Sequence, residues 1–451
     1  CIWCRIGGRI FSGGTMRTNG FVIAFAAAMA LAVGCADSVE EVDIYATNFE
    51  PGVEMRDGVR ILRLKGTPYE MGKQHATFLH DELVKGVEFL ETTELGLLEF
   101  IARDYGFLDD AMAQSYPDVI DECEGMAEVA GAEGWTMDRC MALAYGEIVL
   151  DFFEAGMLQC SQFAAAGPAT VDGELIHGRN LDWGDMSYLL DYPTIMVRAP
   201  EGRIPYVVVG FPGCVAAYNG MNTAGLSIAT NENGSMNDLD REGVPTVQGV
   251  NYMLSHFTKI DEVIDYIVNS DRMSAENMVV TSGHEKRAVV FQMTASHIHY
   301  EELGDDGVNY ITNHFVTEDM QPYEDPKDPG TSTYCRYMRL RQLLEPGFEN
   351  VRDDKVYGSV DPAVAAGILR DRYNPIDMIE YPKGQFDVET ATGGAIAVNA
   401  AIYSIVFKPA SGQFWFAYGS KPIPDNPFVG FNVQELLGND PAAVAVPAVV
   451  E

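Results

Sequence analysis

A cysteine, an arginine and an aspartate mark the point where the chain changes character. Cys160 opens a region of short β-like runs, and the run 173–179 ends in Arg179, with Asp182 three positions later. If Cys160 begins one strand and residues 173–179 form its hairpin partner, Arg179 and Asp182 return beside Cys160. A cation beside a thiol lowers the thiol pKa, and a carboxylate can hold and tune an amine. The residues alone leave two alternatives open: a small buried hydrophobe for Cys160 and a surface pair for Arg179 and Asp182.

The wider sequence pattern resembles the N-terminal-nucleophile (Ntn) hydrolase superfamily. Cys160 followed by the string HGRNLDW at 177–183 is similar to the acyl-CoA:6-aminopenicillanate acyltransferases, the C45-type peptidases. The same string looks like acid ceramidase and acylethanolamine acid amidase, and its Arg-Asn-x-Asp part looks like bile-salt hydrolases and penicillin V acylase. Upstream, GTPYEMGKQH at 66–75 resembles the opening of C45-type precursors. The resemblance runs from about residue 66 to about residue 421.

This resemblance implies a catalytic residue that the chain exposes by cutting itself. The cut would fall between Gln159 and Cys160, so that Cys160 becomes the nucleophile and its freed α-amino group the base. Arg179 and Asp182 match the pair that lines the thiol and orients the amine. Gln159 departs from the pattern, because small residues are more usual before the cut, and this departure puts the efficiency of processing in doubt.

The resemblance also implies residues that stabilise the oxyanion. Asn313 matches an asparagine that donates to the oxyanion, and Arg336, in a Ser-x-x-x-Arg helix start, would stand near the nucleophile. Asn222 matches the turn that leads to an oxyanion-hole element, and Asn231 and Asn233 are further candidates beyond it. Asn also favours turns, so a plain turn residue is the alternative left open for Asn231, Asn233 and Asn313.

The arrangement of elements along the chain supports an α+β fold. Residues 61–64 indicate a short strand, and helical spacing then dominates to residue 156, with helices expected at 90–104, 111–132 and 137–156. After Cys160, short alternating runs separated by turn residues indicate antiparallel hairpins, without the regular βα alternation of a parallel sheet. The natural interpretation is two stacked antiparallel sheets with helices outside, which is the four-layer αββα sandwich of the Ntn hydrolases.

The composition excludes some partners. The chain of 451 residues has 30 basic and 66 acidic residues and a net charge of −36, so it should repel nucleic acid and anionic lipid headgroups. A solubilising acidic surface is the simplest explanation, and attraction of cationic substrates is the other. No zinc-ligand spacing is found beyond the leader, so we expect no metal and no organic cofactor. Cys123 and Cys140 could pair in an oxidising compartment or remain buried free thiols.

The N-terminus resembles an export signal. Met16 is the expected start, Arg17 supplies a positive charge, and residues 21–33 form an apolar stretch too short for a permanent membrane span. The stretch ends in small residues before Cys35, which resembles a bacterial lipobox with lipidation at Cys35. The expected organisation is a leader and signal peptide at 1–35, a tether at 36–58, a helical α-chain region at 59–159, a β-chain core at 160–430 and a loose tail at 431–451. Such a protein would be periplasmic or anchored in the outer membrane as a bacterial lipoprotein.

Together these features predict a self-processing cysteine amidohydrolase. It would cleave the amide bond of a small N-acyl substrate through an acyl-enzyme on Cys160, and its α and β fragments would stay associated after cleavage. Three alternatives remain: acyl transfer to an amine acceptor, a ceramidase-like lipid amidase, and an inactive surface binding protein on the same fold. Membrane contact is expected only through the lipid anchor, and no nucleic acid is expected as a partner.

Overall fold

The computed structural model describes residues 43–93, 96–145, 159–183, 187–233, 238–324, 327, 331–383, 394–439 and 445–451. Residues 44–451 form one compact unit. The expected leader and the candidate lipidation site Cys35 lie outside the described residues. In the described part of the chain, no helix is long and apolar enough to cross a membrane.

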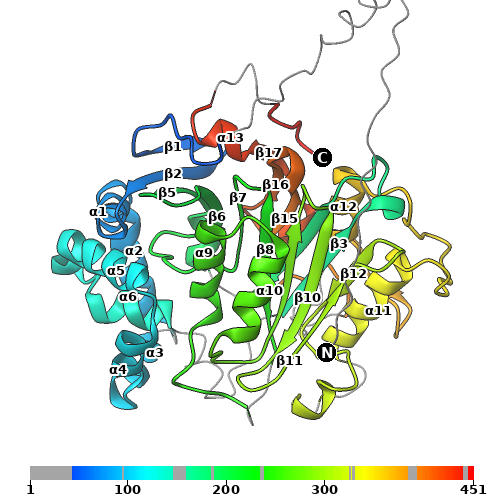
Figure 1. The fold of residues 1–451 in the computed structure, drawn as a ribbon, viewed down its shortest axis with the longest axis horizontal. Coiled ribbons are helices and arrows are strands. Elements are labelled where there is room, and N and C mark those ends of the chain that lie inside the picture. Colours follow the sequence, from blue (N-terminus) through cyan, green and yellow to red (C-terminus); the bar gives the residue numbers. More distant parts are fainter. Residues whose placement is uncertain are drawn as a thin grey trace, which may run out of the picture. The chain divides into compact units, whose positions relative to one another are not determined.

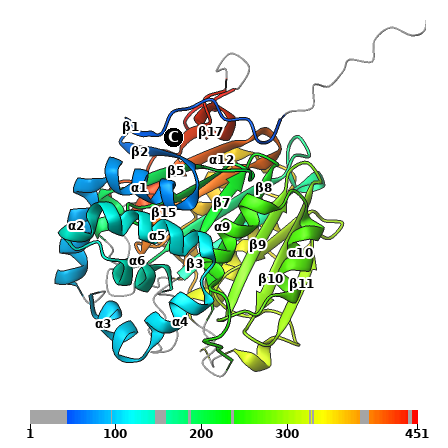
Figure 2. The ribbon, with the colours of Figure 1, turned by 60° about the vertical axis from the view of Figure 1, so that its left-hand side comes forward.

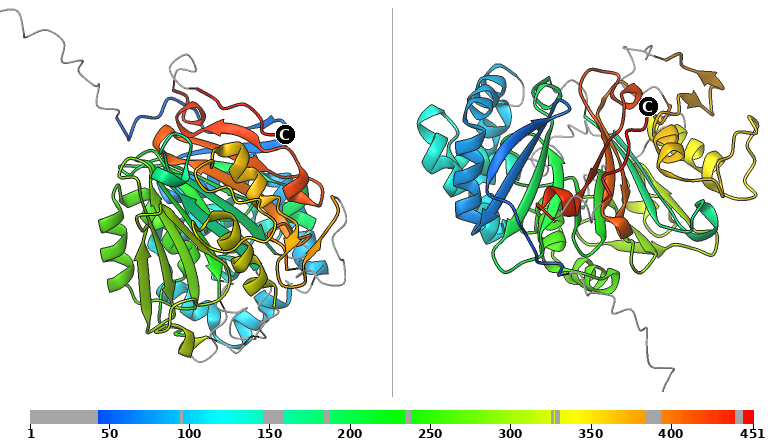
Figure 3. Two further views of the ribbon diagram at one scale, coloured as in Figure 1. Left: turned by 90° about the vertical axis from the view of Figure 1, so that its right-hand side faces the viewer. Right: turned by 90° about the horizontal axis from the view of Figure 1, so that it is seen from above.

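Two β-sheets stack face to face, and helices cover the outer face of each sheet. The view from above in Figure 3 shows the four layers in order: the blue and cyan helices, the first sheet, the second sheet, and the yellow and orange helices. Figure 1 shows the same layers from the side. This αββα arrangement is the one predicted from the sequence.

The larger sheet has nine strands in the order β1-β2-β5-β6-β7-β8-β9-β10-β11. Neighbours pair antiparallel, as expected, except at one junction, where β2 and β5 run parallel. Strand β2 precedes the helical region in the sequence and β5 follows it. A long crossover connection of this kind allows two neighbouring strands to run in the same direction. The strands are β1 (Gly52–Arg56), β2 (Val59–Gly66), β5 (Thr194–Pro200), β6 (Tyr206–Gly210), β7 (Asn219–Asn222), β8 (Leu226–Glu232), β9 (Glu276–Ser282), β10 (Arg287–Met293) and β11 (Ile298–Glu302).

The smaller sheet has six strands in the order β12-β3-β4-β15-β16-β17, all antiparallel. Its central strands β3, β4 and β15 are buried along almost their whole length, because the other sheet covers one face and helices cover the other. The strands are β12 (Val308–Ile311), β3 (Gln159–Ala165), β4 (Ile176–Asp182), β15 (Ala401–Lys408), β16 (Gln413–Ala417) and β17 (Val429–Asn432).

Helices of the N-terminal region cover one end of the nine-stranded sheet, and α9 and α10 cover the rest (Figure 2). Helix α1 begins at a capping box, in which the Thr67 side chain accepts from the backbone of Glu70 and the Glu70 carboxylate accepts from the backbone of Thr67. The helices are α1 (Pro68–Phe78), α2 (His80–Thr92), α3 (Gly96–Asp104), α4 (Phe107–Gln114), α5 (Pro117–Ala130), α6 (Met137–Ala144), α9 (Thr246–His256) and α10 (Ile260–Asn269).

The expected long helices are interrupted. The segment expected as one helix at 90–104 is divided between α2 and α3, and the segment at 111–132 is divided between α4 and α5. Pro117 explains the second break, because proline lacks the N–H that a continuing helix requires and is accommodated at the first helical position. Residues 146–156 of the last expected helix lie outside the described residues.

On the outer face of the six-stranded sheet lie α11 (Ser332–Leu344) and α12 (Pro362–Leu369). Asp361 caps α12 by accepting from the backbone of Val364. Smaller elements complete the unit: α8 (Ser187–Asp191), α13 (Val433–Leu436) and the two-stranded sheet of β13 (Tyr373–Asn374) and β14 (Ile379–Glu380).

A disulfide joins Cys123 of α5 to Cys140 of α6. It closes a loop with a sequence separation of 17, and a cross-link of this length typically stabilises a fold by about 3 kcal/mol. Of the two alternatives that the sequence left open for these cysteines, the structure has the paired one.

Both ends of the unit contain more structure than the sequence indicated. Strand β1 lies within the expected tether 36–58, and Phe49 just before it is buried in the core. In the expected loose tail, the backbone of Val450 pairs with Phe428, and the Trp415 indole donates to the carbonyl of Ala448. Low sequence complexity at a terminus therefore does not prevent it from pairing with a sheet edge.

Candidate active site

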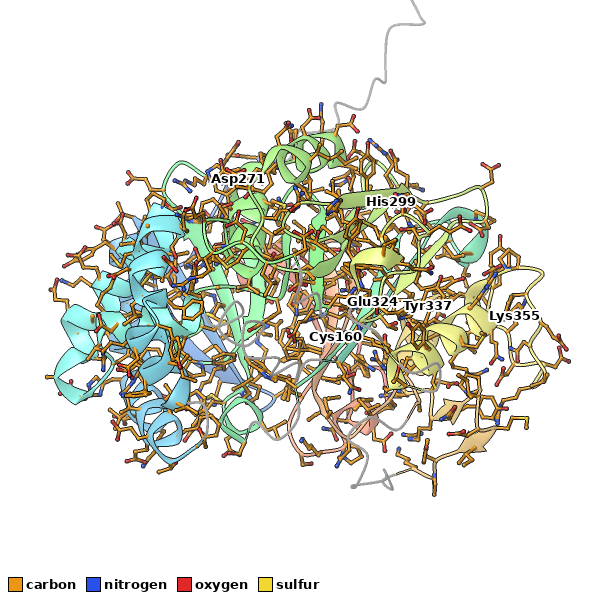
Figure 4. The ribbon with its side chains drawn as sticks, turned by 90° about the horizontal axis from the view of Figure 1, so that it is seen from below. Cys160, Asp271, His299, Glu324, Tyr337 and Lys355 are labelled. Atoms are coloured by element: carbon orange, nitrogen blue, oxygen red, sulfur yellow. A yellow bond between two sulfur atoms is a disulfide. The ribbon has the colours of Figure 1, made fainter. Side chains whose placement is uncertain are left out.

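Strand β3 places Cys160 inside the molecule, where both sheets and α11 meet. The register pairs Cys160 with Leu181 and Gln162 with Arg179 on the adjacent β4, so the hairpin predicted from the sequence is present. Cys160 is fully buried within the apolar core between the sheets. Figure 4, seen from below, places Cys160 near the centre of the layers, with Glu324 and Tyr337 on the side of α11.

The thiol of Cys160 faces the guanidinium of Arg179. The distance from Arg179 Nη2 to Cys160 Sγ is 3.6 Å. Burial raises the pKa of Cys160 to about 11, and the positive charge of Arg179 opposes this rise. In the uncut chain the thiol is therefore protonated at neutral pH, and Arg179 favours its ionised form when the proton is removed.

Two further contacts fix Arg179. Its Nη1 donates to the hydroxyl of Tyr403 at 2.9 Å, and its Nη2 donates to the carbonyl of Thr230 at 2.6 Å. Asn219 also donates to the hydroxyl of Tyr403. Arg179 is completely buried, so these contacts hold a desolvated cation in one orientation.

Asn313 and Arg336 hold the backbone of Cys160. The Cys160 N–H donates to Asn313 Oδ1 at 2.6 Å, and Arg336 donates to the carbonyl of Cys160 and to Asn313 Oδ1, the latter at 3.0 Å. Arg336 also donates to Ser161 Oγ at 3.1 Å and to Ser332 Oγ at 2.9 Å. The spacing of Ser332 and Arg336 on α11 gives the second contact, because residues four apart lie on the same helix face.

Asp182 is a buried carboxylate near Arg179 and Arg336. Among the described residues, neither of its carboxylate oxygens has a hydrogen-bond partner. Burial raises the pKa of Asp182 to about 7, against the lowering influence of Arg336 and Arg179. The register places Asp182 opposite Gln159, the residue before the candidate cut. A carboxyl group whose pKa is raised by burial thus lies beside the Gln159–Cys160 peptide bond, the candidate cut.

The three asparagine candidates differ in what their amides contact. Asn231 is satisfied: its Nδ2 donates to the carbonyls of Ile311 and Thr312 at 3.4 and 3.2 Å, and its Oδ1 accepts from Gln162. Asn233 is not satisfied, because its buried Nδ2 has no partner among the described residues. This difference favours Asn233 over Asn231 as a donor to a bound molecule.

The structure does not bring Asn222 to the residues around Cys160. Its Nδ2 donates to the carbonyls of Leu254 and Phe257, and its Oδ1 accepts from the N–H groups of Ala224 and Leu226. All of these partners are backbone groups at the end of α9 and in the turn between β7 and β8. The amide therefore shapes this turn.

We call Cys160, Arg179, Asp182, Asn313 and Arg336 the nucleophile cluster. The structure brings all five together by hydrogen bonds or by electrostatic influence on one another. His314 is buried against Tyr334 and Tyr337, and burial lowers its pKa to about 3. A neutral histidine in this position fits packing.

Sequence reasoning missed Tyr403 and Lys327. Tyr403 lies in the alternating strand 401–408, where it looks like one more core aromatic. Lys327 Nζ donates to Asn233 Oδ1 at 2.8 Å and to the carbonyl of Asn313 at 3.0 Å, across separations that local spacing cannot reveal. In the described part of the chain, no group of three or more His, Cys, Asp or Glu is arranged to hold a metal ion.

Comparison with known proteins identifies the family. A family model described as acyl-coenzyme A:6-aminopenicillanic acid acyl-transferase matches residues 169–421, which is more than half of the chain. The chain belongs to this family. The matched range includes Arg179, Asp182, Asn313 and Arg336 and begins nine residues after Cys160, so the family resemblance does not depend on the cysteine.

Individual relatives are distant. Protein dcd1B of Dictyostelium discoideum is 24% identical over 264 residues, which are 52% of this chain and 50% of that protein. The chain thus spans about half the length of the curated relative it matches. Among solved structures, a mutant of the conjugated bile acid hydrolase from Clostridium perfringens has 15% identity and a TM-score of 0.41, covering 62% of this chain and 95% of that one. The Caenorhabditis elegans ortholog of N-acylethanolamine-hydrolyzing acid amidase has 17% identity and a TM-score of 0.37, covering 56% of this chain and 93% of that one.

Proposed function

We propose that this family member is a self-processing cysteine amidohydrolase that cuts itself between Gln159 and Cys160 and then cleaves N-acyl amides. The observation that carries the proposal is the position of the buried Cys160 thiol 3.6 Å from the Arg179 guanidinium. An amide needs a strong nucleophile with a base in reach, and an N-terminal cysteine supplies both in one residue.

Self-cleavage begins with attack of Cys160 Sγ on the carbonyl carbon of Gln159. The S–C bond forms, the C–N bond to Cys160 breaks, and the thiol proton passes to the departing nitrogen, which gives a thioester and a free α-amine. Water then opens the thioester, leaving the Gln159 carboxylate and restoring the thiol. Asp182 opposite Gln159, with its pKa raised to about 7 by burial, is placed to exchange protons during these steps.

In turnover the new α-amine accepts the thiol proton, and Sγ attacks the carbonyl carbon of the substrate. Asn313 Oδ1 already accepts from the Cys160 nitrogen, so it orients the amine after the cut. The Asn313 Nδ2 donates one hydrogen to the carbonyl of Glu232, and its second hydrogen is left for the oxyanion, beside the unpartnered Nδ2 of Asn233. Collapse releases the amine, and water resolves the acyl-thioester.

The two fragments are expected to remain associated. Strand β2 of the N-terminal fragment pairs in parallel with β5 of the C-terminal fragment along seven residues, from Arg60 opposite Thr194 to Gly66 opposite Pro200. The cut at Gln159 leaves these hydrogen bonds and the apolar layers beside them intact. The name of the family makes acyl transfer to an amine acceptor the second candidate, in which an amine replaces water in the last step.

Export as a lipoprotein through Cys35 remains part of the proposal. The disulfide between Cys123 and Cys140 supports an oxidising compartment, which agrees with a leader at 1–35. Labelling cells with a radioactive fatty acid should mark the wild-type chain and leave Cys35→Ala unlabelled. An equal label on both proteins would contradict lipidation at Cys35.

The decisive experiment compares the intact mass and N-terminal sequence of wild type, Cys160→Ala and Cys214→Ala. We expect two fragments in the wild type, one beginning Cys-Ser-Gln-Phe, and a single uncut chain in Cys160→Ala. Cys214→Ala is the matched control, because Cys214 is also unpaired but its thiol donates to the carbonyl of Ala216 and not to a member of the nucleophile cluster. A wild-type chain that stays whole would overturn self-processing and favour an inactive binding protein.

A further inference from the structure

Asn233 offers a hydrogen-bond donor that the fold does not use. Its side chain is buried, its Oδ1 accepts from Lys327 Nζ at 2.8 Å, and its Nδ2 has no partner among the described residues. An amide donor buried without an acceptor costs about 1–3 kcal/mol. A buried donor without an acceptor requires an explanation, and a bound molecule that supplies the acceptor is one.

Lys327 connects Asn233 to the nucleophile cluster. The same ammonium that contacts Asn233 Oδ1 donates to the backbone carbonyl of Asn313 at 3.0 Å. Asn313 Nδ2 in turn donates to the carbonyl of Glu232, the residue before Asn233. The two amides are therefore tied together by one cation on one side and by one backbone contact on the other.

Glu324 holds Lys327 in place. Its Oε1 accepts from Lys327 Nζ at 2.6 Å, and its Oε2 accepts from the N–H of Phe315 at 2.9 Å. The ion pair thus contacts both ends of the segment from Asn313 to Phe315. Lys327 donates to the carbonyl at one end, and Glu324 accepts from the N–H at the other. Because Glu324 is almost fully buried and Lys327 is mostly buried, this pair is screened less than a surface pair.

We infer that Lys327 is a positioning residue that sets the orientation of the Asn233 amide, so that Nδ2 points toward the developing oxyanion. An ammonium carries three donors and no acceptor, so only the oxygen of the amide can face it. The nitrogen must then face the other way. Without the cation, the amide can turn by half a rotation and present its oxygen to the oxyanion, which repels it.

This inference rests on the proposed function, because it assigns a role within the amide-cleaving reaction. Its test uses the self-cleaved wild-type protein and a panel of short-chain and long-chain acyl amides of aminomethylcoumarin as probes. The variants are Lys327→Met, Lys327→Arg, Asn233→Ala and the double variant of Lys327→Met with Asn233→Ala. Lys73→Met is the control, because Lys73 pairs with Glu128 on the surface.

Removal of one oxyanion donor typically lowers kcat by about 10²–10³-fold. We expect Asn233→Ala to lie in that range and Lys327→Met to lose about tenfold to a hundredfold in kcat with little change in KM. The double variant should be no slower than Asn233→Ala, because Lys327 acts through that amide. Lys327→Arg should recover most of the rate, since arginine also has donors and no acceptor, and Lys73→Met should match the wild type.

The outcomes separate the two proposals. A wild type that cleaves itself but turns over no amide would sink the proposed function and this inference with it. A wild type that turns over, beside Lys327→Met with an unchanged kcat, would overturn the inference alone. The same conclusion follows if the losses of Lys327→Met and Asn233→Ala multiply in the double variant. If Lys327→Met does not fold, the kcat of Lys327→Arg is compared with that of Asn233→Ala. A loss of kcat in Lys327→Arg as large as that in Asn233→Ala counts against the inference.

Discussion

Two buried groups of arginine and carboxylate lie on different layers of this fold and are satisfied in opposite ways. The outer ion pair, which we define as Glu122 and Arg198, lies between α5 and the nine-stranded sheet, where Arg198 donates directly to the Glu122 carboxylate. In the nucleophile cluster, Asp182 has two arginines near it but no hydrogen-bond partner among the described residues.

The pKa directions express this difference. Burial acts to raise the pKa of Glu122, but the adjacent Arg198 prevails and holds it below its ordinary value. For Asp182 burial prevails, and its pKa rises to about 7. The guanidinium of Arg336 is used instead on the carbonyl of Cys160 and on Asn313. The outer charges therefore neutralise each other, while the inner arginines contact the backbone and the thiol of Cys160.

The comparison predicts that the outer ion pair serves stability alone. In a Cys160→Ala background, which keeps the chain whole, Arg198→Met should lower the free energy of unfolding by about 3–5 kcal/mol, because the buried Glu122 carboxylate loses its cation and keeps only His75, whose Nδ1 lies 3.9 Å away. Adding Glu122→Gln should recover much of this loss, since no buried charge then remains. Urea denaturation followed by circular dichroism gives both values.

The assignment of the outer ion pair to stability alone would be wrong if Arg198→Met, in a chain that retains Cys160, folds at low temperature but fails to cleave itself. Such a result would mean that the two charged groups are coupled across the sheet. Equal destabilisation by the single and double variants would instead show that packing of the Arg198 side chain, and not its charge, carries the effect.

Part of the nucleophile cluster was predictable from local rules, whereas Asn313 and Arg336, which contact Cys160 across 153 and 176 positions, were indicated only by the family resemblance. Hairpin pairing of β3 and β4 returns Arg179 and Asp182 to Cys160, and the four-residue spacing from Ser332 to Arg336 follows helix geometry. The alternation of short runs also gave the layered fold. In each case the residues that meet are joined by one turn or one helix, so their spacing in the sequence carries the information.

What escaped prediction depends on partners distant in the sequence. Tyr403 contacts Arg179 across 224 positions, and Lys327 contacts Asn233 across 94. The parallel pairing of β2 with β5 and the burial of Phe49 likewise depend on which layer covers which. The Asn222 motif was recognised, but only the structure shows that backbone groups take up its amide.

The pH dependence of stability at Asp182 provides the second test of the contrast between the two charged groups. The folded pKa of Asp182, about 7, lies above its ordinary value of 3.8, so its contribution to stability is fully present below pH 3.8 and is lost as the pH rises through 7. In the Cys160→Ala background, Asp182→Asn should therefore be more stable than its parent at pH 8 by on the order of 2–4 kcal/mol. The difference should shrink toward pH 4.

The free energy of unfolding measured at several pH values checks this sign. Glu122→Gln in the same background is the matched control, and it should destabilise at pH 8 because the Glu122 carboxylate is paired. If Asp182→Asn also destabilises at pH 8, the inner carboxylate has a partner in solution and the contrast between the two groups disappears.

The substitution Tyr403→Phe has the smallest expected effect of the three, and it tests how the Arg179 guanidinium is held. Tyr403→Phe removes the hydroxyl that accepts from Arg179 Nη1 at 2.9 Å, so the guanidinium is held less firmly against Cys160 Sγ. We expect kcat/KM to fall about tenfold, equivalent to about 1.4 kcal/mol, and the apparent pKa for alkylation of the thiol by iodoacetamide to rise. Tyr145→Phe removes an equally buried hydroxyl that donates to the carbonyl of Arg241 and should leave both quantities unchanged. An unaltered alkylation profile in Tyr403→Phe would show that the carbonyl of Thr230 alone suffices to hold Arg179. Arg179 would then be held by a backbone carbonyl, whereas Arg198 is held by a carboxylate.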